Sequence, residues 1–121
     1  MSDKLDELAE MGHFLIGIQL FLTSKKPKEA LHDLWVLGYC FGLFDAMAQR
    51  AKLDQYTDGI ALITIGFLLL LSKPLKGAEK IRQALDNQTD PDFARVAQAA
   101  LFAWCADRNK APMSLFNQLT H

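Results

Sequence analysis

The stretch IALITIGFLLLL, residues 60–71, decides the fold class of this chain. It contains one hydroxyl group, that of Thr64, and no charged side chain. As a helix, residues 59–71 would be about 20 Å long, whereas the hydrocarbon core of a bilayer is roughly 30 Å thick. Apolar runs of about 10 to 14 residues are more typical of buried helices than of membrane spans. Because Asp58 precedes the run and Lys73 follows it, the stretch predicts a core helix.

The composition around this stretch favours helices throughout. The chain has 121 residues, of which 50% are hydrophobic, with 20 leucines, 15 alanines and only two valines. Leucine and alanine lose little side-chain freedom in a helix, whereas β-branched residues favour sheets. A chain of this length has room for one core. We therefore predict a single all-α domain over residues 1–121.

Capping residues and prolines divide the chain into about five helices and a short C-terminal helical turn. Ser2 and Asp54 are suitable N-caps, and Pro27 and Pro91 suit the first turn of a helix. Pro74 ends the helix before it, because proline restricts the preceding residue. The predicted helices cover about residues 2–22, 27–51, 54–73, 75–86 and 91–108, and the last turn runs from Pro112 through Leu119. We expect a compact bundle with the third helix central and buried.

The third helix is apolar around its whole circumference, so it has to be enclosed on all sides. Four other helices could just surround it, or a neighbouring subunit could cover the side that they leave open. The fifth helix offers a contact surface, since Phe102 lies on its polar side and Ala99 and Ala106 flank that side without bulk. We therefore predict a symmetric homodimer with Ala99, Phe102 and Ala106 at its interface. Packing within a monomer is the alternative.

The second predicted helix carries features of a small-ligand pocket. Gly38 and Gly42 lie one turn apart, which allows either the close approach of a neighbouring helix or a gap for a flat ligand. Asp45 falls within the arc that should be buried, where a carboxylate must be paired or hydrogen-bonded. It either has a structural partner, such as a hydroxyl, a backbone donor, Arg50 or Arg108, or it lies at the floor of a pocket. The predicted ligand-binding residues are Trp35, Tyr39, Phe41 and Asp45.

Two Glu-x-x-His pairs, Glu10 with His13 and Glu29 with His32, match the spacing that helical bundles use for two-metal sites. The apolar arc of the first helix centres on Met11, Leu15, Ile18 and Leu22. Both pairs lie away from the apolar arcs of their helices, and the other helices contribute only Glu79. We therefore expect solvated pairs, with no metal site and no cofactor. Since no nucleophile elbow or glycine-rich phosphate loop occurs, no catalytic residue is assigned.

The charge and the cysteine content limit the kinds of binding partner and the cellular location that we expect. Thirteen basic and fourteen acidic residues leave a formal charge of −1, and the densest basic group is Lys25, Lys26 and Lys28. This distribution argues against nucleic-acid binding. Cys40 and Cys105 have neither zinc spacing nor the density of a disulfide scaffold, and the chain does not start with a leader-like segment. A cytoplasmic location is expected.

The sequence therefore favours a non-catalytic interaction or scaffold protein that acts as a homodimer. The alternative is a module that binds a small hydrophobic ligand between helices, around Trp35, Tyr39 and Asp45. Two further hypotheses are an enzyme that uses Asp45 with a cysteine or a histidine, and a peripheral membrane protein whose apolar helices open onto a bilayer.

Overall fold

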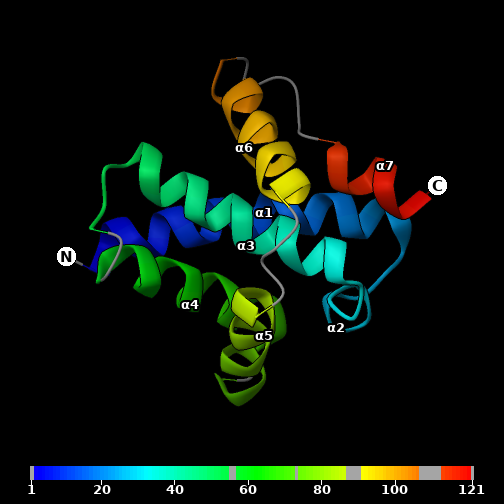
Figure 1. The fold of residues 1–121 in the computed structure, drawn as a ribbon, viewed down its shortest axis with the longest axis horizontal. Helices are drawn as coiled ribbons and strands as arrows, with labels where there is room; N and C mark the ends of the chain where they lie inside the picture. Colours follow the sequence, from blue (N-terminus) through cyan, green and yellow to red (C-terminus); the bar gives the residue numbers. More distant parts are fainter. Residues whose placement is uncertain (1, 55–56, 73, 87–90, 107–112, 121) are drawn as a thin grey trace.

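The computed structural model describes residues 2–54, 57–72, 74–86, 91–106 and 113–120, and these residues form seven α-helices and no strand (Figure 1). The helices are α1 (Ser2–Thr23), α2 (Pro27–Ala30), α3 (Leu34–Arg50), α4 (Asp58–Leu71), α5 (Pro74–Asp86), α6 (Pro91–Ala106) and α7 (Ser114–Thr120). The prediction of an all-α fold is confirmed.

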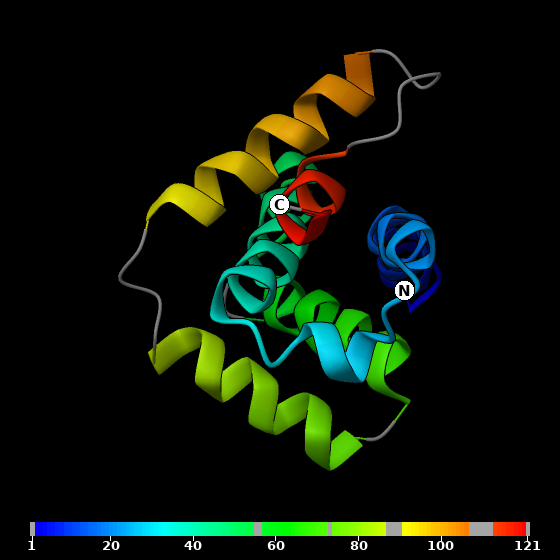
Figure 2. The same ribbon diagram turned by 90° about the vertical axis from the view of Figure 1, so that its right-hand side faces the viewer.

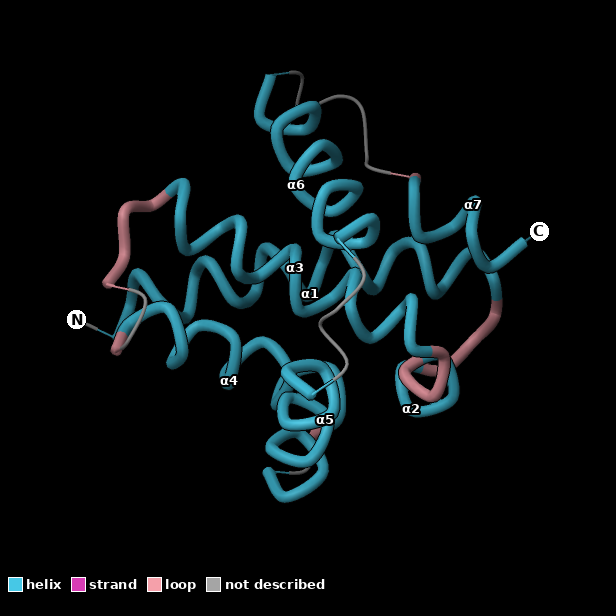
Figure 3. The backbone as a smooth tube through the Cα atoms, in the orientation of Figure 1, coloured by secondary structure: helices cyan, strands magenta, loops and turns pink. Residues whose placement is uncertain are grey.

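The single helix predicted for residues 27–51 is instead two helices, α2 and α3, with a turn between them (Figure 3). Asp33 causes the break, because its Oδ1 atom accepts hydrogen bonds from the backbone amides of Trp35 at 2.8 Å and Val36 at 3.4 Å. These amides open α3 and have no partner within the helix, so an aspartate here starts a new helix.

The start of α4 also differs from the prediction. Asp54 is not its N-cap; the backbone carbonyl of Asp54 accepts hydrogen bonds from the amides of Thr57 at 3.3 Å and Gly59 at 2.7 Å. The helix therefore begins at Asp58. Its last residue is Leu71, before Pro74 as predicted.

Helices α1, α3 and α4 run along the long axis of the molecule, and α5 and α6 cross them at opposite edges (Figure 1, Figure 2). Helix α3 contacts α1, α4, α5 and α6, whereas α7 lies mainly against α1. Val36, Cys40 and Leu43 of α3 have no exposed surface. Most of the core is therefore built around α3.

One face of the apolar helix α4 belongs to the core of the protein. Phe67 and Leu62 are fully buried, but Ile60 is 53% exposed on the other side. Thr64 lies on this exposed side, and its hydroxyl donates a hydrogen bond of 2.8 Å to the Ile60 carbonyl. The complete enclosure expected for this segment is not found among the described residues, because Ile60 and Thr64 stay exposed although α1, α2, α3 and α5 all contact α4. No helix among the described residues combines the length and the hydropathy that a membrane span requires.

The Phe44 side chain of α3 fills the space between α1 and α4. A Cβ atom built on Gly12 of α1 or on Gly66 of α4 would overlap the Phe44 ring. The ring also packs against that of Phe67, with centroids 6.1 Å apart. Two glycines therefore let three helices approach one aromatic ring, and these glycines, unlike Gly38 and Gly42, were not singled out from the sequence.

Candidate functional site

The four predicted ligand-binding residues lie on two different sides of α3. Trp35 and Tyr39 are one turn apart and their rings are stacked, with centroids 5.5 Å apart and planes at 19°. Phe41 lies six residues after Trp35, which is about 240° around the helix, and Asp45 follows Phe41 by one turn. Trp35 therefore lies beside Tyr39, and Phe41 lies one turn from Asp45, but the four residues do not share one side of the helix. Ligand binding by this set stays a prediction.

Asp45 is partly buried and has a polar partner on its own helix. The amide nitrogen Nε2 of Gln49 donates a hydrogen bond of 2.9 Å to Asp45 Oδ2. The Oε1 atom of Gln49 in turn accepts a hydrogen bond of 3.4 Å from Gln98 of α6. Asp45 thus begins a chain of polar contacts between α3 and α6. A glutamine takes the role that was expected of Arg50 or Arg108, and Arg108 lies outside the described residues.

The predicted dimer surface lies on the outer side of α6. Ala99 and Ala106 are exposed, and Phe102 is 48% exposed. The guanidinium carbon of Arg50 lies 5.7 Å from the centre of the Phe102 ring, within the range of a cation–π contact. The Phe102 ring therefore already has a partner in its own chain, and its role in dimerisation stays a prediction.

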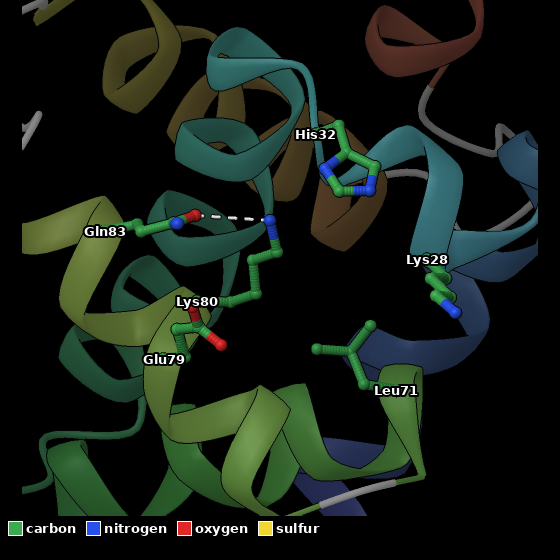
Figure 4. A pocket seen from close by; sticks show the side chains of 6 residues that line it. All are labelled: Lys28, His32, Leu71, Glu79, Lys80 and Gln83. Carbon is green, nitrogen blue, oxygen red and sulfur yellow. Dashed lines mark hydrogen bonds between the residues drawn. The ribbon is translucent and has the colours of Figure 1, made fainter.

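A polar cavity of about 200 Å³ opens between α2, the end of α4, and α5 (Figure 4). The Lys80 ammonium group donates a hydrogen bond of 3.2 Å to Gln83 Oε1 and extends toward the side of the cavity where His32 lies. The Glu79 carboxylate lies beside these groups, and Lys28 stands on the opposite side. The cavity is lined by Lys28, His32, Leu71, Glu79, Lys80 and Gln83. Since acidic and basic groups share it, the lining selects no single ligand charge.

An apolar cavity of about 160 Å³ lies between α1, the end of α3, and α6. Met47 and Leu101 form its buried wall, with 2% and 1% exposure. Arg50 is the one charged residue in the lining, and its side chain is exposed. The cavity is lined by Leu8, Met11, Met47, Arg50, Ala51, Leu101 and Cys105. This arrangement suits a small apolar molecule.

A shallow groove of about 340 Å³ runs along the outer face of α1 and is called the α1 groove below. Phe14 is 58% exposed and Phe21 is 81% exposed, although both are large apolar side chains. Between them lies Gly17, where a Cβ atom would meet no other atom within 4 Å. The groove is lined by His13, Phe14, Gly17, Ile18 and Phe21. It is an open apolar surface with a glycine at its centre.

The two cysteines differ in environment. Cys40 is fully buried in α3, and burial raises the pKa of its thiol well above its usual range. Cys105 is partly buried, and both are free thiols. The described residues contain no group of three or more histidine, cysteine, aspartate or glutamate side chains that could hold a metal ion.

The α1 groove is the feature that sequence reasoning missed. Of the predicted inward arc of α1, the structure buries Leu15 but leaves Leu22 exposed and Met11 and Ile18 only partly buried. It buries Gly12, Ile16 and Gln19 instead. One signal was available, because Gln19 interrupts the apolar run from Phe14 to Leu22 and marks a position that needs a specific polar partner.

In comparisons with models of protein families, with characterised proteins and with solved structures, no significant match to this chain was found.

Proposed function

We propose that this chain is a non-catalytic interaction protein that acts as a homodimer, and that two copies meet through their α1 grooves. The observation that carries this proposal is the exposure of Phe14 and Phe21 on the same face of one helix. Burying a phenylalanine that is otherwise exposed contributes about 1.5–3 kcal/mol. Exposed apolar surface of this kind is typical of interaction sites.

A second copy of the same chain fits the α1 groove in an antiparallel orientation. With a two-fold axis between Gly17 and Ile18, Phe14 of one copy faces Phe21 of the other, and the reverse contact follows by symmetry. The missing side chain of Gly17 leaves space for the two helices to approach closely.

Charge supports the same pairing. In this register Glu10, one turn before Phe14, faces Lys25, which follows the end of α1, and both residues are exposed. The groove is therefore flanked by an acidic group at one end and a basic group at the other, so that the surface is complementary to itself. Such complementarity favours one orientation and one kind of partner.

The α6 surface with Ala99, Phe102 and Ala106 is the second candidate for the interface. It is the less favourable one, because Phe102 is less exposed than Phe21 and its ring is already in contact with Arg50. The two surfaces lie on different helices and can be tested separately.

The test compares Phe21→Glu with the matched variant Phe102→Glu by light scattering. The wild-type chain should have a mass of about 27 kDa, twice its 13.6 kDa. Phe21→Glu should give the monomer mass and Phe102→Glu should leave the dimer intact. A monomeric wild type would contradict the dimer, and dissociation by Phe102→Glu alone would assign the interface to α6.

A cytoplasmic location is part of the proposal. The support is that Cys40 and Cys105 are both free thiols, as is usual where the surroundings are reducing. The near-neutral formal charge of −1 supports a protein partner over a nucleic acid.

A further inference from the structure

The apolar cavity between α1, α3 and α6 has a composition that points to a ligand, and this inference is independent of the proposed dimer. Its lining shares no residue with the α1 groove. Apart from Arg50, the lining side chains are aliphatic or contain sulfur. The space inside is therefore suited to the apolar part of a molecule.

The size of the cavity limits the ligand. An apolar cavity of about 150 Å³ in a protein core is large enough to hold benzene, and the volume here is about 160 Å³. Met11 and Met47 supply flexible walls that adapt to ligands of somewhat different shape. The apolar part of the ligand should therefore contain about five or six carbon atoms.

Arg50 indicates the chemistry of the polar end of the ligand. Its guanidinium group makes a contact with the Phe102 ring, but no ion pair with an acidic residue is found for it among the described residues. No acidic side chain contributes to the lining. A guanidinium group presents parallel N–H donors that match the two oxygens of a carboxylate.

We propose that this cavity binds a small monocarboxylate, with an apolar body of about five or six carbons between Met11, Met47 and Leu101 and its carboxylate on Arg50. The partly buried thiol of Cys105 lies in the same lining and reports on occupancy. Cys40 does not compete as a reporter, because it is fully buried elsewhere in α3.

The experiment uses the full-length chain with hexanoate as the probe, and 1-hexanol and acetate as probes that lack the charge or the apolar body. Two quantities are measured, the melting temperature and the rate at which iodoacetamide alkylates Cys105. Hexanoate should raise the melting temperature more than either comparison compound and should slow alkylation several-fold. No stabilisation and no protection by hexanoate would overturn the proposal.

Separate variants test the charged contact with Arg50 and the apolar contacts inside the cavity. Arg50→Gln should weaken hexanoate binding about tenfold or more while leaving hexanol unchanged, because only the charged contact is lost. Lys52→Gln is the matched control, since Lys52 is a nearby exposed cation outside the lining. Ala51→Met should fill the cavity and reduce binding of both compounds. Equal hexanoate binding by Arg50→Gln and the wild type would overturn the assignment of the carboxylate to Arg50.

The monomeric variant Phe21→Glu distinguishes this proposal from the proposed function. It should bind hexanoate as the wild type does, because Phe21 is not part of the cavity. Loss of binding in this variant would place the ligand at the dimer interface and contradict the proposed site.

Discussion

The side-chain oxygen of Gln19 in α1 accepts a hydrogen bond of 3.0 Å from the backbone amide of Phe116 in α7. Phe116 belongs to the first turn of α7, where backbone amides have no partner within the helix. Met113 precedes this helix and has no side-chain oxygen to serve as a cap. Gln19, with no exposed surface, therefore caps α7 from 97 residues away.

Replacing Gln19 by methionine should remove this cap while keeping the length of the side chain. We expect the free energy of unfolding to fall by about 1–3 kcal/mol, because the partly buried amide of Phe116 loses its acceptor. The exchange of the Phe116 amide hydrogen, measured by NMR, should become faster. Gln49→Met is the control for an exposed glutamine, because water can replace its hydrogen bonds to Asp45 and Gln98, and its effect should stay below about 1 kcal/mol. Equal effects of the two substitutions on the free energy of unfolding would show that capping of α7 by Gln19 does not stabilise the fold.

Gly66→Ala should destabilise the protein, because the added methyl group would overlap the Phe44 ring. Overpacking costs about 1–3 kcal/mol and alanine regains up to about 1 kcal/mol of helix propensity, so a net loss near 1 kcal/mol or more is expected. Gly77→Ala in α5 is the matched control, since its Cβ would meet only ordinary contacts at 3.7–3.8 Å. Urea unfolding of both variants is the measurement, and an unchanged Gly66→Ala midpoint would contradict this packing.

Local signals in the sequence were sufficient for the helix class and for several boundaries. Pro27 and Pro91 each stand at the first position of a helix, as predicted, whereas Pro74 was expected only to end the helix before it and is in fact the first residue of α5. The break at Asp33 was missed, because the residues on both sides of it, Leu31 and Leu34 among them, continue an apolar helical pattern. Whether an aspartate lies within a helix or caps one depends on how the flanking turns pack, and residue spacing does not report this.

Asp33→Ala should therefore destabilise α3 by about 1 kcal/mol, since two backbone amides lose their acceptor. Asp33→Asn is the matched variant and should retain most of the stability, because asparagine caps helices nearly as well. Thermal unfolding followed by circular dichroism measures both. If Ala and Asn gave the same melting temperature, the side-chain cap would not contribute to stability.

The candidate sites were harder to predict than the helices, for a reason that α1 illustrates. Its apolar run has hydrophobic residues on every face, so periodicity does not say which face turns inward. The structure turns Gly12 and Gln19 inward because Phe44 needs the space at Gly12 and Phe116 needs the oxygen of Gln19. Both requirements arise from distant parts of the chain, and Phe14 and Phe21 are exposed as a consequence.

Burial of Cys40 predicts a loss of stability at alkaline pH. In the unfolded chain this thiol ionises near its ordinary pKa of 9.0, whereas burial raises its pKa in the folded chain. Its contribution to stability is therefore complete below pH 9 and is lost progressively as the pH rises above that value, because only the unfolded state releases the proton. Urea unfolding across this range should show a smaller alkaline loss for Cys40→Ala than for the wild type. Cys105→Ala retains the buried thiol and should keep the wild-type loss, and parallel curves for all three chains would contradict the prediction.

The antiparallel register of the proposed dimer predicts the outcome of a charge exchange between Glu10 and Lys25. Glu10→Lys would place two lysines opposite each other at both ends of the interface, and Lys25→Glu would do the same with two glutamates. Each single variant should weaken dimerisation about tenfold, since facing like charges are unfavourable, and the double variant should restore it because opposite charges face each other again. The dissociation constants come from sedimentation equilibrium, and the differences between the variants should shrink at high salt.

Glu79→Lys in α5 is the control, because it makes the same change in net charge as Glu10→Lys on an exposed residue away from α1, and it should leave the dimer unchanged. If the double variant were as weak as the single ones, Glu10 and Lys25 would not face each other, and a parallel or displaced arrangement of α1 would replace the one proposed.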